Sequence, residues 1–197
     1  MPLNLFIIGP SGCGKSTQAK KIAEKYGITH FSTGQVFRDE IASGSELGLE
    51  AKKHIDQGLF CPDNILIPIV EGILEKVNFQ NFIIDGTPRR LNQAIEIQKM
   101  LISHQQDITF IIHLDVSAQE IVDRRLKLQQ LGGQFQDESR SDNTPEAIAK
   151  RQAQYNELNQ PILDHFQSTG KLLRVDGNRA IEPIFEDIVK EIEKLNG

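Results

Sequence analysis

Residues 9–17 read Gly-Pro-Ser-Gly-Cys-Gly-Lys-Ser-Thr, a glycine-rich stretch whose residue types and spacing suit phosphate binding. The stretch matches G-x-x-x-x-G-K-[ST], with Gly9, Gly14, Lys15 and Ser16 at the four fixed positions. Glycines let backbone N–H groups converge on phosphate oxygens without a clash from a Cβ atom. Lys15 can bridge the outer phosphates of a nucleotide, and the Ser16 hydroxyl can ligate Mg²⁺.

The segments on either side of this loop supply the elements that must position it. Residues 3–8 form an apolar run of strand length, and residues 17–26 carry helix formers with apolar residues at helical spacing. A helix that starts near Lys15 turns the positive end of its dipole toward the same anion. Strand, loop and helix in this order indicate a working phosphate loop rather than a glycine-rich turn that binds nothing.

Further apolar runs predict the remaining strands and helices. Strands are expected at residues 29–32, 81–85, 108–115 and 172–176, and helices at residues 33–42, 47–57, 65–74, 91–101, 118–131, 145–166 and 181–195. Buried strands that are each followed by a helix indicate a parallel sheet covered on both faces. We therefore expect an α/β fold of the P-loop NTPase type, with small helices inserted between core elements after residue 32.

Composition limits the classes of protein that fit. The chain has 197 residues, which suits one domain, and its net charge of −5 leaves no polybasic surface for a nucleic acid polymer. Its two cysteines form no C-x-x-C pair, so we expect neither a zinc site nor a disulfide framework. No apolar run approaches the ~18 residues of a membrane span, and residues 3–8 lack the basic flank of a signal peptide. A cytoplasmic enzyme is the expectation.

Three further groups of residues have types that suit a second anionic substrate and a metal ion. They are Thr33-Gly34 with Arg38, Asp85-Gly86-Thr87-Pro88-Arg89 with Gln93, and Arg124, Arg140 and Arg151 near a polar loop that contains glycine. The planar guanidinium of arginine grips phosphate oxygens bidentately. An aspartate at the carboxyl end of a strand beside a phosphate loop can hold Mg²⁺ directly or through water. Each of these residues alone would be an ordinary helix or turn residue. Their joint occurrence, in this order around a phosphate loop, favours a functional role for the whole set.

Over essentially its whole length the chain resembles an adenylate kinase, within the nucleoside monophosphate kinase family. The resemblance is carried by residues 9–18, 22–28, 31–34, 85–89, 114–116, 140–142, 150–151 and 175–177. It implies reversible, Mg²⁺-dependent transfer of a phosphoryl group from ATP to AMP, giving two ADP, by a monomer. It also implies one P-loop kinase domain over residues 1–197. An insert at residues 32–61 would bind the monophosphate, and a short lid at residues 128–142 would close to exclude water.

The resemblance also implies roles for individual residues. ATP would be bound by Gly12, Cys13, Gly14, Lys15, Ser16, Thr17, Arg124 and Arg179. AMP would be bound by Thr33, Arg38, Leu59, Phe60, Cys61, Gly86, Thr87, Pro88, Arg89, Gln93, Arg140 and Arg151. The catalytic cations would be Lys15, Arg89, Arg124, Arg140 and Arg151, and Ser16 and Asp85 would hold Mg²⁺, partly through water.

Two positions bear on the choice of base. In the family, Thr at position 33 and Gln at position 93 accompany adenine, whereas pyrimidine-specific relatives typically carry Ala and Asn. The Gln93 amide offers one donor and one acceptor, which match the N6 amino group and a ring nitrogen of adenine. The resemblance therefore favours AMP over CMP or UMP.

Three departures from the family pattern leave alternatives open. Gln35 and Thr87 replace the usual Asp and Phe, and Leu128 stands where a second lid arginine is expected. One alternative is a kinase for another small acceptor, such as CMP, UMP or a hydroxy acid. Another is a catalytically weak sensor that binds nucleotides. A signalling GTPase is not indicated, because the sequence contains no Asn-Lys-x-Asp motif.

Overall fold

The computed structural model describes residues 2–130 and 145–194, without the side chains of residues 125, 128–130 and 145. Within this part of the chain, five strands form one parallel sheet in the order β2-β3-β1-β4-β5. The strands are β1 (Asn4–Ile8), β2 (Thr29–Ser32), β3 (Phe82–Asp85), β4 (Phe110–Asp115) and β5 (Leu172–Asp176). The helices are α1 (Lys15–Tyr26), α2 (Thr33–Ser43), α3 (Glu46–Ile55), α4 (Asp63–Glu75), α5 (Leu91–Ser103), α6 (Ala118–Gln130), α7 (Pro145–Ser168) and α8 (Ile181–Glu193).

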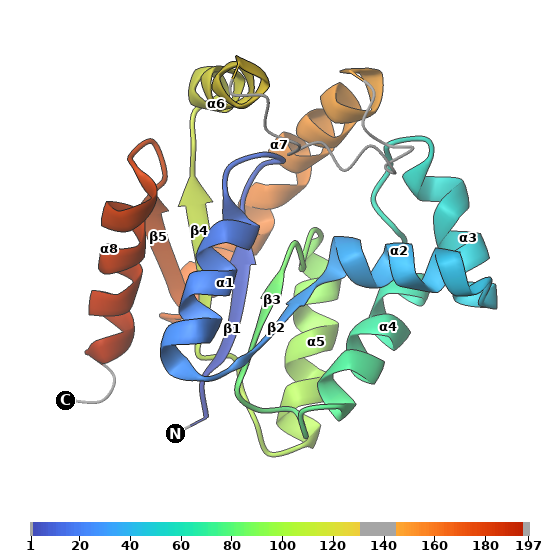
Figure 1. Ribbon diagram of the computed structural model, residues 1–197. Coiled ribbons are helices and arrows are strands. Elements are labelled where there is room, and N and C mark those ends of the chain that lie inside the picture. The colour runs from blue at the N-terminus through green and yellow to red at the C-terminus, as the bar shows by residue number, and fades with distance from the viewer. Residues whose placement is uncertain (1, 131–144, 195–197) are drawn as a thin grey trace.

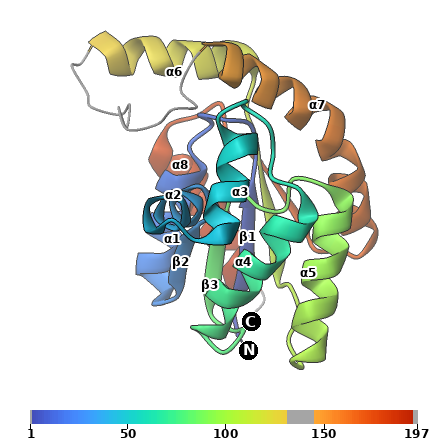
Figure 2. The same cartoon turned by 90° about the vertical axis from the view of Figure 1, so that its right-hand side faces the viewer.

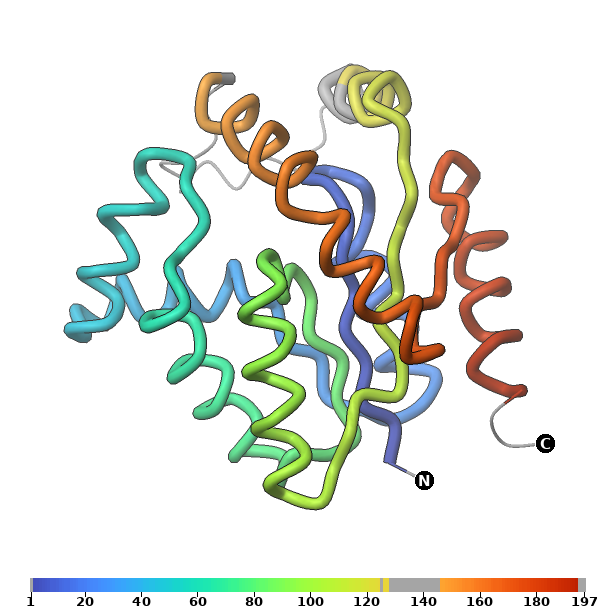
Figure 3. Tube along the Cα trace, turned by 180° about the vertical axis from the view of Figure 1, so that it is seen from behind, coloured from blue at the N-terminus to red at the C-terminus, as the bar shows by residue number. Residues whose placement is uncertain are grey.

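Helices cover both faces of the sheet, as Figures 1 and 3 show. Along β1, Leu5 and Ile7 face a cluster that includes residues of α1 and α8, while Phe6 and Ile8 face α4, α5 and α7. This alternation follows from the period of two along a strand. Because both faces are buried, all five residues of β1 are buried. The α/β fold with a doubly covered parallel sheet is confirmed.

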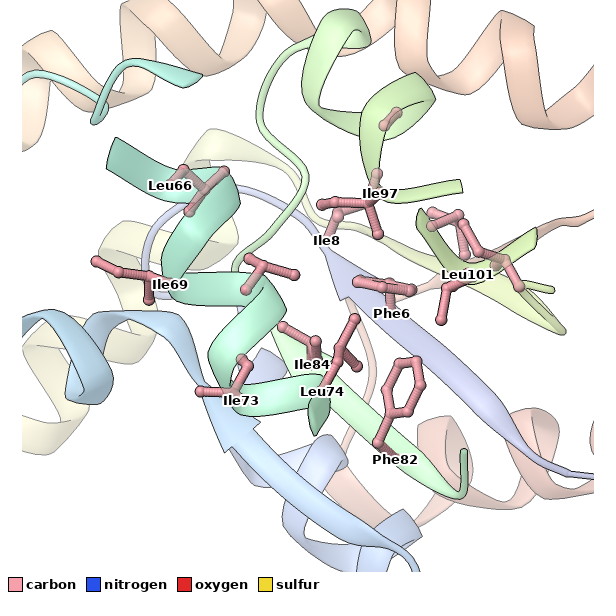
Figure 4. Close-up of a cluster of buried hydrophobic side chains, with 14 of the residues drawn as sticks. Phe6, Ile8, Leu66, Ile69, Ile73, Leu74, Phe82, Ile84, Ile97 and Leu101 are labelled. Atoms are coloured by element: carbon pink, nitrogen blue, oxygen red, sulfur yellow. The ribbon is translucent and has the colours of Figure 1, made fainter. Parts of the chain in front are cut away.

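The larger core cluster lies between the sheet and the helices α4 and α5 (Figure 4). Phe6 and Phe82 meet edge to face, with ring centroids 5.6 Å apart, in the favoured geometry for an aromatic pair. Ile73 and Leu74 of α4 pack on the same cluster, together with Ile97 and Leu101 of α5. This packing fixes the register of β1 and β3, whose carboxyl ends carry the residues with candidate chemistry.

The segment between β2 and α4 folds into two short helices, as the sequence predicted. Gly44 ends α2 in the left-handed conformation, and the Ser45 side chain caps α3 by accepting a hydrogen bond from the Gly48 N–H at 3.0 Å. A Cβ at Gly48 would lie 2.2 Å from the Glu40 carbonyl oxygen, so only glycine permits this close crossing of α2 and α3. Ser32 occupies the position before α2, but its side chain makes no capping hydrogen bond.

The carboxyl ends of the strands gather at one edge of the molecule. The phosphate loop follows β1 at this edge, and Figures 1 and 2 place α6 and the first turns of α7 above it. In a parallel sheet this edge is where ligands bind. Among the described residues, no helix is long and apolar enough to cross a membrane.

Candidate active site

The phosphate loop connects the end of β1 at Ile8 to the start of α1 at Lys15. Gly12 and Gly14 have φ angles of +86° and +100°, which residues with a Cβ rarely adopt. A Cβ at Gly9 would lie 2.8 Å from the Cys13 sulfur, so the tight turn depends on glycine there. The first turn of α1 carries no acidic residue of its own, and the positive end of its dipole faces the loop.

The Lys15 ammonium lies folded over the phosphate loop. Its Nζ donates hydrogen bonds to the carbonyl oxygens of Gly9, at 3.0 Å, and Pro10, at 2.8 Å. Both partners are neutral and belong to the loop itself. A phosphate oxygen entering the loop would offer this ammonium a charged acceptor in their place.

The candidate metal ligands Ser16 and Asp85 are in contact. The Ser16 hydroxyl donates a hydrogen bond to Asp85 Oδ2, and Asp85 is 4% exposed at the end of β3. The pairing of β1 with β3 sets Asp85 beside Ile7, two residues before the loop begins. A hydroxyl and a carboxylate side by side are hard oxygen ligands of the kind that Mg²⁺ prefers, so these residues fit that ion.

Two adjoining pockets form one cleft along the carboxyl edge of the sheet. The first is lined by Thr33, Gly34, Phe37, Arg38, Ile55, Leu59, Phe60, Cys61, Leu66, Gly86, Thr87, Arg89, Gln93 and Arg151. The second is lined by Ile8, Gly9, Ser11, Gly12, Lys15, Ser16, Ser32, Thr33, Gly34, Arg38, Phe60, Asp85, Gly86, Pro88, Arg89, Arg151, Tyr155, Asn159 and Ile162. The two pockets share Thr33, Gly34, Arg38, Phe60, Gly86, Arg89 and Arg151.

The cleft is positively charged although the chain as a whole is acidic. Lys15, Arg38, Arg89 and Arg151 line it, and Asp85 is the one acidic residue among its described lining residues. Three of these cations lie where the two pockets meet. A concave, one-signed cluster of this kind concentrates anions. The sequence-predicted cations are thus brought together, apart from Arg124, Arg140 and Arg179, which are considered below.

The arginine of the turn after β3 is held in a defined position. Arg89 Nε donates to the Gly86 carbonyl oxygen at 2.7 Å, and its guanidinium carbon lies 4.4 Å from the centre of the Phe60 ring. A Cβ at Gly86, whose φ is +89°, would come within 3.0 Å of the Thr33 hydroxyl oxygen. Thr33 itself donates to the Asp85 carbonyl oxygen at 2.9 Å. These contacts join the start of α2, the turn after β3 and the segment that precedes α4 around the cleft.

Much of the lining of the first pocket is apolar. Phe60 and Cys61 are buried, and burial raises the pKa of the Cys61 thiol to about 11, against the opposing effect of Arg89. The thiol is therefore neutral at physiological pH. Arg38, which also lines this pocket, donates to Gln35 Oε1 at 2.5 Å.

The Gln93 amide differs from the sequence expectation of one free donor and one free acceptor. Its Nε2 donates to Asp63 Oδ1 at 2.9 Å and to the Cys61 carbonyl oxygen at 3.3 Å, while its Oε1 accepts from the Arg89 N–H at 2.9 Å. A carbonyl and a carboxylate only accept, and a backbone N–H only donates, so these partners fix the amide orientation. Both N–H groups are engaged, and one lone pair of Oε1 is left over.

Some sequence-predicted residues lie outside the cleft lining. Arg124 sits behind the phosphate loop, where it donates to the carbonyl oxygens of Cys13 at 2.9 Å, Gly177 at 2.5 Å and Arg179 at 3.1 Å, and to Glu120 Oε1 at 2.8 Å. Arg179 pairs with Asp187 at 2.6 Å. Cys13 is buried below the loop, and neither Gly14 nor Thr17 is among the lining residues. Arg140 and most of the predicted lid, residues 131–142, lie outside the described residues.

Sequence reasoning missed several residues of the cleft. Tyr155, Asn159 and Ile162 follow Arg151 on α7 at spacings of four, four and three, so they lie on one helical stripe along the second pocket. That spacing was a usable signal, because Arg151 was already a candidate. Asp63, which orients Gln93, carries no such signal, since a position at the start of a helix is ordinary for an aspartate.

Comparison with known proteins identifies the family. The family model for adenylate kinase matches residues 7–171. The adenylate kinase of Phocaeicola vulgatus is 39% identical over 194 residues, which are 98% of this chain and 100% of the relative. The adenylate kinase of Methanothrix thermoacetophila is 35% identical over 217 aligned positions, again with 98% and 100% coverage. These matches confirm the resemblance carried by the motifs, and the chain belongs to the adenylate kinase family of nucleoside monophosphate kinases.

Proposed function

We propose that this chain transfers the terminal phosphoryl group of ATP to AMP, reversibly and with Mg²⁺, giving two ADP. The observation that carries the proposal is the single cleft that joins the phosphate loop to a second pocket, with cations at their junction. One nucleotide would lie with its phosphates on the loop, and the other would lie in the first pocket. Their phosphates would then meet at Arg38, Arg89 and Arg151.

This arrangement supports phosphoryl transfer because that reaction asks little covalent chemistry of the protein. The protein must place donor and acceptor in line and neutralise charge on the transferred group. Lys15 and the loop N–H groups would hold the donor phosphates, and Arg89 and Arg38 the acceptor phosphate. Arg151, which lines both pockets, would contact both.

Ser16 and Asp85 are the proposed magnesium ligands, with water completing the shell. When bound, Mg²⁺ neutralises phosphate charge and helps to orient the donor. The contact between the two side chains, at the rim of the loop, supports this assignment. Within the described residues no group of three or more His, Cys, Asp or Glu side chains could hold a metal ion, and we propose no zinc site.

We further propose that residues 32–61 act as the monophosphate-binding insert and residues 128–142 as a short lid. Residues 32–61 supply Arg38 and most of the apolar residues that line the first pocket. Closure of both segments would exclude water, which otherwise competes with AMP for the phosphoryl group. Roles for Arg124 and Arg179 on the ATP side, for Arg140 in the lid, and a monomeric state remain predictions.

The test is a panel of nucleoside monophosphates offered with ATP and Mg²⁺, with ADP formation as the readout. AMP should be the best acceptor, and omission of Mg²⁺ should abolish turnover. A preference for CMP or UMP would replace the proposed acceptor. If no acceptor gives ADP but a bisubstrate analogue, two adenosines joined by a phosphate chain, still binds tightly, the chain is a nucleotide sensor and not a working kinase.

A further inference from the structure

A partly buried hydrogen bond ties α7 to β4, the strand beside the one that leads into the phosphate loop. His113 Nε2 on β4 and the Tyr155 hydroxyl on α7 are 2.8 Å apart, although 42 positions separate them in the sequence. His113 is 5% exposed, and nothing in the proposed function uses it. A polar side chain inside a sheet is costly unless it is hydrogen-bonded, so this pair needs an explanation.

Both partners are neutral at physiological pH. Burial, against the opposing effect of Asp115 and with a smaller contribution from Arg174, lowers the pKa of His113 to about 4. Burial also raises the pKa of the Tyr155 hydroxyl above its ordinary value. The other ring nitrogen of His113, Nδ1, has no hydrogen-bond partner among the described residues. The bond to Tyr155 is therefore the one hydrogen bond described for the imidazole ring.

The same helix presents a phosphate-binding candidate one turn earlier. Arg151 precedes Tyr155 by four residues, so the two side chains lie on the same face of α7. Arg151 is 8% exposed and lines both pockets, and Tyr155 lines the pocket of the phosphate loop. Figure 3 shows α7 crossing the back of the sheet next to α5. The position of Arg151 thus depends on how this part of α7 packs against the sheet.

Two other side chains of α7, those of Gln154 and His165, form hydrogen bonds with distant parts of the chain. Gln154 donates to the Gly58 carbonyl oxygen at 3.0 Å and accepts from the Phe60 N–H at 3.2 Å, which ties the helix to the monophosphate-binding insert. His165, ten residues beyond Tyr155, contacts Gln98 of α5 at 3.2 Å. Among these contacts, the bond between His113 and Tyr155 is the one that joins the Arg151 region to a strand of the sheet.

We propose that Tyr155 is a positioning residue, which acts through its hydrogen bond to His113 to hold Arg151 where the two nucleotide pockets meet. The inference rests on the proposed function, because it gives Arg151 the task of neutralising phosphate charge during transfer. A small displacement of a cation from the transferred group lowers the rate much more than it weakens binding of either substrate.

The test is a double-mutant cycle of Tyr155→Phe and Arg151→Ala. Tyr155→Phe keeps the ring and removes only the hydroxyl, and kcat should fall about 10-fold while the KM for ATP changes less than about 2-fold. In the Arg151→Ala background, Tyr155→Phe should cause no further loss, because its effect is transmitted through the arginine. Tyr26→Phe is the matched control, since Tyr26 OH contacts the Val189 carbonyl oxygen at 3.5 Å on the far side of the sheet, and it should keep full activity.

A second pair of variants separates positioning from loss of the fold. His113→Gln replaces the imidazole with an amide that can hydrogen-bond Tyr155 and should stay within about 3-fold of wild-type kcat, whereas His113→Leu should match Tyr155→Phe. The same double-mutant cycle is also measured as affinity for the bisubstrate analogue, because this measurement requires no turnover. If the losses caused by Tyr155→Phe and Arg151→Ala are additive, or if Tyr155→Phe keeps full activity in an enzyme that makes ADP, this inference is overturned and the proposed function is not. A chain that binds the analogue but makes no ADP with any acceptor would overturn the proposed function alone.

Discussion

The Ser16 hydroxyl donates a hydrogen bond to the Asp85 carboxylate, which joins the first turn of α1 to the end of β3. The two residues are 69 positions apart and come from different strand–loop units. Pairing of β1 with β3 brings them together, because the register that places Asp85 beside Ile7 also places it beside the loop that follows β1. The two oxygen ligands are therefore assembled by the sheet before any nucleotide binds, which favours rapid capture of a nucleotide that carries Mg²⁺.

Removing either oxygen ligand should raise the Mg²⁺ concentration that catalysis requires. We expect Ser16→Ala and Asp85→Asn each to raise the Mg²⁺ concentration for half-maximal ADP formation by about 10-fold or more. Titration of Mg²⁺ at fixed ATP and AMP measures this. Ser103→Ala and Asp164→Asn make the same chemical changes at exposed positions away from the cleft and should leave the titration unchanged. An unaltered titration in both cleft variants would show that these residues do not hold the ion.

Lys15→Met should lower kcat at least about 100-fold. The substitution keeps an unbranched side chain of similar length but removes the charge that would neutralise the transferred group. Initial rates of ADP formation at saturating ATP and AMP measure the loss. Lys20→Met, at an exposed position of α1, is the control and should keep the wild-type rate. A Lys15→Met variant within about 3-fold of wild type would argue against a phosphate contact at this residue.

The fold and the phosphate loop were predictable because their signals are local. Residues 9–17 carry the loop pattern, and the apolar runs that flank it differ from the observed β1 and α1 by two residues or fewer at each boundary. Asp85 could be placed at the same edge because the strands of a parallel sheet all end there. Neither prediction required knowledge of how side chains pack.

The features of the site that the sequence did not predict depend on contacts between residues far apart in the chain. The orientation of the Gln93 amide is set by Asp63 and the Cys61 carbonyl oxygen, about 30 positions earlier. The backbone partners of Arg124 are carbonyl oxygens of two loops that meet only in the folded chain. Pairing of His113 with Tyr155 requires the seating of α7 on β4. Sequence patterns give the period of an element but not its rotation against its neighbours, so these contacts could not be foreseen.

The Gln93 amide should favour a base that carries an amino group, because its one remaining hydrogen-bonding site accepts. Asp63→Ala would release one Nε2–H and provide a donor for a carbonyl. We therefore expect the ratio of kcat/KM for AMP to that for IMP, which has a carbonyl at position 6, to fall about 10-fold. Parallel assays with the two acceptors measure the ratio.

Asn92→Ala is the control for this change of selectivity. Asn92 Nδ2 donates to Asp63 Oδ2 at 3.3 Å, and the hydrogen bonds described for the Gln93 amide do not include Asn92, so its loss should leave the AMP to IMP ratio as in wild type. An unchanged ratio in Asp63→Ala would mean that Gln93 turns to meet either base, and that Asp63 does not fix its orientation during catalysis.

The buried imidazole of His113 should make the fold less stable in mild acid. Its pKa in the folded chain is about 4, below the value of about 6.5 expected in the unfolded chain. Between these values the unfolded chain binds a proton that the folded chain does not, so the free energy of unfolding falls as the pH falls through this window. Below pH 4 this loss is complete. Between pH 6.5 and pH 5, His113 lowers the free energy of unfolding by about 1 to 2 kcal/mol.

Urea unfolding at the two pH values should show a smaller decrease in the free energy of unfolding for His113→Gln than for wild type. His54→Gln, on α3 outside the core, should show the wild-type decrease. Equal decreases in wild type and His113→Gln would mean that His113 is not kept neutral by the fold.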